Sequence, residues 1–134
     1  MTEPQIRKYL LGNISASELE KVNTIEAKDY GRHVPYYKAV EMIQEGDFEI
    51  RVHHMVSICD DVLNGKMRPG TVDLLSFILI GSDYFFWDIN TKEGERIADV
   101  IFEWSNETIN YPLTINNFVQ WRKYLCGEPR KMQS

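Results

Sequence analysis

Apolar residues recur at helical spacing through most of this 134-residue chain, and the clearest case lies between Ile50 and Asn64. Within that segment, one apolar stripe follows the i, i+3, i+4, i+7 rhythm of a helix that packs one face against a core. The stripe consists of Val52, Met55, Val56, Cys59, Val62 and Leu63. Gly65 follows as a natural terminator, because glycine readily adopts the left-handed conformation in which many helices end. A chain built from such segments is expected to fold as packed helices.

Start and stop residues bound further helical segments along the chain. Pro4 suits the first turn of a helix, where its missing N–H is not needed, and Ser15 with Glu18 forms the S-x-x-E capping-box pattern. Gly127 ends the last apolar-periodic segment, which Thr114 opens. The predicted helices cover residues 2–13, 15–30, 35–45, 50–64, 72–80, 94–104 and 114–125.

The segment from Val72 to Ile80 is almost entirely apolar, which indicates a buried central helix. A buried strand is the rival interpretation, because Phe77 to Ile80 is β-branched and aromatic in character. The following Ser82 to Asp88, SDYFFWD, is compatible with a short helix or an extended edge strand.

Composition places these segments in one domain. Hydrophobic residues make up 43% and charged residues 26% of the chain, which is typical of a globular protein with a real core. We therefore predict a bundle-like all-α domain of six or seven helices over residues 1–127, followed by a flexible tail over residues 128–134. The alternative is an α+β domain with a small sheet around residues 74–90.

The charge balance and the motifs exclude several function classes. Fifteen Lys+Arg against 20 Asp+Glu give a net charge of −5, which argues against direct nucleic-acid binding. P-loop, GxGxxG and GxSxG motifs are absent, so no cofactor is predicted. Cys59 and Cys126 form no CxxC pair and are expected to be reduced thiols. With no signal-peptide pattern and no membrane-length apolar stretch, we expect a cytoplasmic location and no membrane association.

Three carboxylates spaced four residues apart form a row on one predicted helix: Glu95, Asp99 and Glu103. This spacing places them on one helical face, where like charges destabilise the helix by about 0.2–0.5 kcal/mol per pair. Glu103 also lies near the helix C-terminus, where the dipole disfavours an anion. Because the row does not help its own helix, it is a candidate surface for a basic partner.

Aromatic residues flanked by acids precede that helix. Asp83 and Asp88 enclose four aromatic residues, and Tyr84 and Trp87 are three apart, so one helical face could present both. Most of these rings are expected in the core. Acids around an aromatic anchor are nevertheless typical of a binding hot spot for a basic protein. The candidate surface therefore also includes Asp83, Tyr84, Trp87 and Asp88.

A second candidate surface lies on the polar face of residues 50–64. It consists of His53, His54, Asp60 and Asp61. His53 and Asp60, like His54 and Asp61, are seven residues apart, which is about 10.5 Å along a helix. Zinc ligands on one helix usually take i, i+4 spacing, so no metal site is predicted. The face is kept as a candidate surface for binding a partner.

The C-terminal half resembles small bacterial immunity proteins of contact-dependent growth inhibition and related polymorphic toxin systems. The resemblance lies in SDYFFWD, in a helix from Gly94 to Phe102-Glu103-Trp104, in Tyr111-Pro112-Leu113-Thr114, and in the Trp121…Tyr124-Leu125 ending. The opening IRKYLLGNISASELE is similar to the first helical hairpin of such chains.

This resemblance implies a non-enzymatic protein that binds a cognate toxin domain, often a basic cytoplasmic nuclease, and blocks its active site. An acidic inhibitor can mimic the phosphate backbone and associate rapidly with such a toxin. The resemblance assigns no individual residue, so the candidate residues rest on the charge pattern. Two alternatives remain, a cytoplasmic adaptor or regulatory module and a small metal-dependent hydrolase that uses the histidine–aspartate face.

Overall fold

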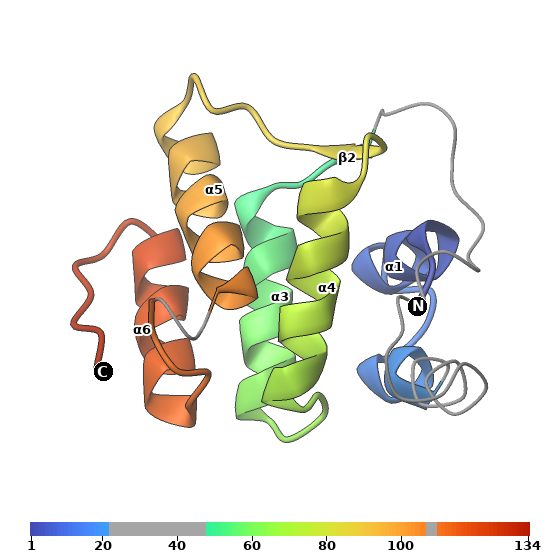
Figure 1. Cartoon of the computed structure of the whole chain (residues 1–134), viewed down its shortest axis with the longest axis horizontal. Coiled ribbons are helices and arrows are strands. Elements are labelled where there is room, and N and C mark those ends of the chain that lie inside the picture. The colour runs from blue at the N-terminus through green and yellow to red at the C-terminus, as the bar shows by residue number, and fades with distance from the viewer. Residues whose placement is uncertain (22–47, 107–109) are drawn as a thin grey trace.

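The computed structural model describes residues 1–21, 48–106 and 110–134, and this part of the chain is mostly helical (Figure 1). The elements are α1 (Glu3–Leu10), a helical stretch at residues 16–21, β1 (Phe48–Glu49), α3 (Val52–Leu63), α4 (Pro69–Gly81), β2 (Phe85–Phe86), α5 (Lys92–Ser105) and α6 (Ile115–Leu125). The predicted class, a small and mainly helical fold, is confirmed.

The N-terminal helices begin at the residues where the sequence predicts them to start. The Thr2 side chain accepts a hydrogen bond from the Gln5 N–H at the start of α1. The Ser15 hydroxyl accepts from the Glu18 N–H at 3.1 Å, and Glu18 accepts from the Ser15 N–H at 3.2 Å, so the predicted capping box is present. The end of that helix and the helix predicted over residues 35–45 lie outside the described residues.

Helix α5 is the centre of the helical packing, because it contacts α4, α6 and α3. Helix α3 packs mainly on α6, and α4 packs mainly on α5. Three fully buried aromatic side chains join α5 to α6: Trp104 lies 5.8 Å from Phe118 and 6.1 Å from Trp121, measured between ring centroids. The core thus holds α5 in a defined orientation, with its remaining face turned outward.

The apolar segment near the middle of the chain is a helix and not a strand. Residues 69–81 form α4, so the rival strand interpretation of residues 77–80 is wrong. Extended structure begins later, where β2 pairs in parallel with β1 and Phe85 lies opposite Phe48. Within the described residues, no helix is both long and apolar enough to cross a membrane.

The C-terminal tail, which the sequence predicts to be loose, is packed back on the bundle. The Asn117 side chain donates to the Gln133 carbonyl at 2.9 Å and accepts from the Gln133 N–H at 2.8 Å. The Lys131 N–H donates to Gln120 Oε1, and Met132 packs against the core. Residues 130–133 therefore lie beside α6, where their side chains can contact α5.

Candidate functional site

Helix α5 carries the predicted row of carboxylates on its outward face. Thr91 caps the helix by accepting from the Gly94 N–H, and Ile97, Val100 and Ile101 are buried beneath. Glu93 and Glu95 lie in the first turn, where the helix dipole stabilises an anion. The amphipathic pattern thus places the row at the surface of the helix, but other elements decide how much of each carboxylate reaches solvent.

The three members of the row have different environments. Glu95 is exposed, and its carboxylate forms no hydrogen bond or ion pair with another described residue. Asp99 is also exposed, but Oδ2 accepts a 2.5 Å hydrogen bond from the Tyr124 hydroxyl, and this bond raises the pKa of Tyr124. The carboxylates of the row therefore differ in how freely they can contact a partner, and that of Glu95 is the most available.

Glu103 is mostly covered, with only 13% of its side chain exposed. Its carboxylate accepts from both terminal nitrogens of Arg130, at 2.6 and 2.9 Å, and from the Trp121 indole N–H at 2.9 Å. The prediction treats Glu103 as a member of an open acidic row, whereas the structure places it in an ion pair with the protein's own tail. The tail and α6 cover a helix face that the sequence of α5 alone would leave to solvent.

The aromatic–acidic segment before α5 divides differently from the prediction. Asp83 and Asp88 are exposed, whereas Tyr84 is only 5% exposed and Trp87 is half-buried against the core. Because residues 85–86 are a strand, the helical face expected to present Tyr84 and Trp87 together does not exist. Tyr84 is excluded as an exposed anchor.

Three exposed apolar residues in the same region are absent from the predicted surface. They are Phe86, Ile89 and Phe102, with exposed fractions of 44%, 62% and 55%. Phe102 was detectable in the sequence, because it follows Asp99 by three and Glu95 by seven positions and falls outside the buried stripe of α5. The acidic face of α5 therefore includes a large apolar side chain.

The structure brings Asp88 to the start of α5. Its carbonyl oxygen accepts from the Thr91 hydroxyl and N–H, and Gly94 packs directly against the Asp88 backbone. Asp83 precedes β2, and the connection from β2 to α5 crosses one end of the bundle (Figure 1). Asp88 and Glu95 thus belong to one end of α5, whereas Asp83 lies at the far end of this connection.

Glu93, in contrast, fastens α5 to α3. Its carboxylate accepts from the Arg51 guanidinium at 2.9 and 3.1 Å and from the Val52 N–H at 3.0 Å. The Arg51 hydrogen bonds and the Val52 N–H together lower the pKa of Glu93 to about 2, despite some desolvation. Glu93 therefore caps α3 and is not part of the open acidic surface.

The second predicted surface, on α3, is largely used for internal contacts. His54 is 8% exposed, and its Nδ1 accepts from the Arg51 N–H at 2.9 Å. Burial, followed by the nearby His53 and Arg51, lowers the pKa of His54 to about 4. Asp60 accepts from Arg122 Nε at 2.6 Å and thereby joins α3 to α6. Of this set, only the His53 side chain is exposed and has no hydrogen bond or ion pair among the described residues.

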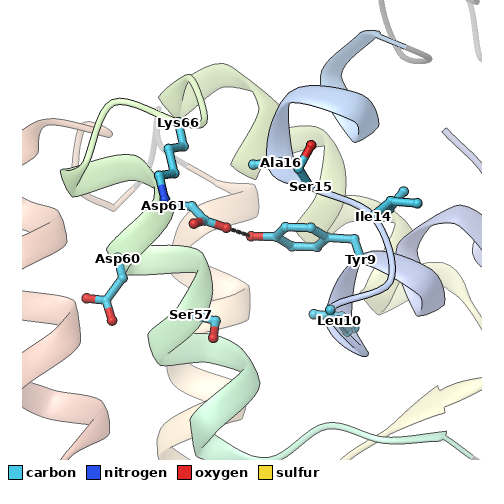
Figure 2. A pocket seen from close by; sticks show the side chains of 10 residues that line it. Tyr9, Leu10, Ile14, Ser15, Ala16, Ser57, Asp60, Asp61 and Lys66 are labelled. Carbon is cyan, nitrogen blue, oxygen red and sulfur yellow. Dashed lines mark hydrogen bonds between the residues drawn. The ribbon is translucent and has the colours of Figure 1, made fainter.

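Asp61 forms the back of a pocket between α3 and the end of α1. Figure 2 shows the Tyr9 hydroxyl pointing at the Asp61 carboxylate across the pocket, and the hydrogen bond measures 2.5 Å. Burial and this bond raise the pKa of Tyr9. The cavity measures about 340 Å³, and Ser57 and Lys66 also line it. Asp61 is therefore used to join α3 to α1. The pocket is lined by both polar and apolar side chains.

In the described ranges, no group of three or more His, Cys, Asp or Glu side chains is arranged to hold a metal ion. Cys59 is buried and Cys126 exposed, and both are free thiols. Comparisons of the chain with protein-family models, curated proteins and solved structures find no match. Function is therefore inferred from the exposed residues and their contacts.

Proposed function

We propose that this chain is an immunity protein that binds and neutralises a basic toxin domain, such as a nuclease, in the cytoplasm. The resemblance noted in the sequence supports this function. The binding surface would be the outward face of α5 and the segment that leads into it. We call this the α5 acidic surface and define it by Asp88, Glu95, Asp99 and Phe102, with Asp83, Phe86 and Ile89 at its margin.

The observation that carries the proposal is the combination of exposed carboxylates and exposed apolar side chains on one segment. Between residues 82 and 106, Asp83, Asp88, Glu95 and Asp99 are exposed, whereas Glu93 and Glu103 are paired with arginines. Lys92 and Arg96 are the two basic residues of this segment. Four exposed carboxylates against two bases leave a negative local field, which accelerates association with a basic protein.

Apolar residues would supply affinity where the charges supply speed. Aromatic side chains are enriched among interface residues that dominate binding energy. Phe102 is exposed one helical turn from Asp99, so a partner could bury its ring while contacting the carboxylate. This residue replaces Tyr84 as the candidate anchor.

The hydrolase alternative receives less support. Of its four candidate residues, His54 is buried and both aspartates are hydrogen bonded to other helices. The adaptor alternative uses the same kind of surface and differs only in the partner.

Recovery of the partner from native lysate tests the proposal. The tagged chain would be used as bait at low and moderate salt, and bound proteins identified by mass spectrometry. A basic toxin domain at near-equal amount, whose activity the chain abolishes, supports an immunity protein. A housekeeping enzyme or receptor supports an adaptor and contradicts the proposal.

Association kinetics with that partner then test the surface. Glu95→Gln should slow association several-fold at low salt and reduce its salt dependence, because it removes one charge from the steering field. Glu18→Gln is the matched control, since glutamine also completes a capping box and Glu18 lies outside the α5 acidic surface. Equal rates for the two variants would place the interface elsewhere.

A further inference from the structure

The guanidinium of Arg130 occupies a site built from two helices. Its terminal nitrogens donate to the two Glu103 oxygens at 2.6 and 2.9 Å, and its central carbon lies 4.1 Å from the centre of the Tyr124 ring. Paired hydrogen bonds to a carboxylate, with an aromatic face against the same planar group, are selective for arginine over lysine. The site therefore has the chemistry of an arginine receptor.

Residues other than Arg130 hold this site in shape. The Trp121 indole N–H donates to Glu103, and the Tyr124 hydroxyl donates to Asp99. The Glu103 carboxylate and the Tyr124 ring are thus held in place by residues of α5 and α6, without a contact from the tail. With Arg130 in place, only 13% of the Glu103 side chain is exposed, so the attraction between its carboxylate and the bound guanidinium is less screened by water than in a pair of surface charges.

The backbone of the tail is fastened by separate contacts. Asn117 exchanges two hydrogen bonds with Gln133, and Gln120 accepts from the Lys131 N–H. The Arg130 side chain can therefore rotate out of the site without release of the tail. A groove of about 560 Å³, lined by Glu95, Arg96, Tyr124 and Arg130 among others, opens beside it to solvent.

We infer that this site, which we call the arginine site (Glu103, Tyr124 and their supports Trp121 and Asp99), receives an arginine side chain of a protein partner. In the free chain, Arg130 is the autoinhibitory occupant that the incoming arginine replaces. The identity of the partner as a basic toxin rests on the proposed function, but the arginine site does not.

Exchange of one arginine for another makes such a replacement feasible. The number of ion pairs with Glu103 is unchanged, and the displaced Arg130 returns to water. A tethered side chain competes at an effective concentration of roughly millimolar or more. An external arginine should therefore bind weakly while Arg130 is present and more tightly once it is removed.

A peptide titration on the full chain tests this inference. The probe is acetyl-Gly-Arg-Gly-amide, and the readout is the indole N–H resonance of Trp121 in a nitrogen–proton NMR spectrum. Arg130→Gln should bind the peptide at least tenfold more tightly than the unmodified chain, with a shift of the Trp121 resonance. Lys131→Gln is the matched control, because it removes the adjacent charge and leaves the arginine site occupied.

Two further measurements keep the outcome decisive. Acetyl-Gly-Lys-Gly-amide should bind Arg130→Gln more weakly than the arginine peptide does. The double variant Glu103→Gln with Arg130→Gln should bind the arginine peptide no more tightly than the unmodified chain. Equal binding by the unmodified chain and Arg130→Gln, or a gain that survives loss of Glu103, would overturn the inference. If Arg130→Gln does not fold, Arg130→Lys is measured against the same criteria, since lysine keeps the charge but lacks the two-pronged hydrogen bonding.

Failure of this inference is distinguishable from failure of the proposed function. A chain that captures and inhibits a toxin but shows no arginine site retains its function and loses only this contact. A chain that binds the arginine peptide but captures no toxin retains the site and loses the proposed function.

Discussion

The hydroxyl of Tyr9 donates a 2.5 Å hydrogen bond to Asp61 Oδ2, and the two residues lie 52 positions apart in the sequence. The bond joins α1 to α3 across the pocket of Figure 2. Tyr9 is only 7% exposed, so the bond is partly shielded from water. It is therefore a good site for measuring how strongly the N-terminal helix is coupled to the rest of the bundle.

A double-mutant cycle with Tyr9→Phe and Asp61→Ala should give a coupling free energy of about 1–2 kcal/mol, because each variant removes one partner of a hydrogen bond to a charged group. The free energies of unfolding come from urea titrations of the unmodified chain, both single variants and the double variant. Additivity within about 0.5 kcal/mol would show that the bond contributes nothing specific.

Glu103→Ala should destabilise the fold by about 1–3 kcal/mol, because it removes the ion pair with Arg130 and leaves the Trp121 indole N–H without its acceptor. Glu95→Ala on the same helix face is the control and should change the free energy of unfolding by less than about 0.5 kcal/mol. Urea unfolding followed by circular dichroism measures both. Equal effects would mean that Glu103 is as solvated as Glu95.

Stability should fall as the pH drops from about 4.5 to about 2, partly through Glu93. The pKa of Glu93 is lowered to about 2 in the folded chain by Arg51 and the Val52 N–H. The ionised carboxylate therefore makes its full contribution to the free energy of unfolding above pH 4.5, the pKa of this group in the unfolded chain. As the pH falls through 2, the contribution disappears. Glu93→Gln should therefore be less stable than the unmodified chain at pH 6 and nearly equal to it near pH 2. A pH-independent difference in urea midpoint would contradict this assignment.

His54 should make the free energy of unfolding depend on pH in a second range, between pH 6.5 and about 4. Burial keeps the folded imidazole neutral, with a pKa of about 4, whereas the unfolded chain takes up the proton near pH 6.5. Stability is then lost as the pH falls through this window and levels off below it. His54→Gln keeps an acceptor for the Arg51 N–H but does not titrate, so its urea midpoint should vary less over this range. A direct check is proton NMR of the His54 ring, which should remain neutral at pH 5.

Gly94→Ala should destabilise the fold by about 1–3 kcal/mol, because the new Cβ atom would lie 1.7 Å from the Asp88 carbonyl oxygen. Relief of that contact would move Asp88 away from the start of α5. Gly81→Ala is the matched control, since a Cβ atom there meets nothing within 4 Å, and it should be neutral or stabilising by about 0.4–1 kcal/mol. Thermal unfolding of both variants measures the difference. A tolerated Gly94→Ala would mean that the turn at Asp88 yields easily.

Local features of the fold were predictable from the sequence. The caps at Ser15 and Thr114 are confirmed, and so are the start of the first helix and the helix that ends before Gly65, which has a positive φ of 74°. Each of these depends on residues within a few positions of one another, so periodicity and capping chemistry suffice. The extended β2 segment was ambiguous, because its pairing partner β1 lies far away in the chain.

By itself, the sequence determined the approximate extent of α1, α3, α5 and α6 and the apolar face of each. Only the tertiary structure decided which polar faces remain open. Glu103 meets Arg130, Asp60 meets Arg122 and Glu93 meets Arg51, across separations of 27, 62 and 42 positions. The period of one helix shows that a carboxylate points away from that helix's own core stripe, but it carries no information about which other element covers it. That is why Glu95 stayed exposed while Glu103, on the same predicted face, became part of the internal structure.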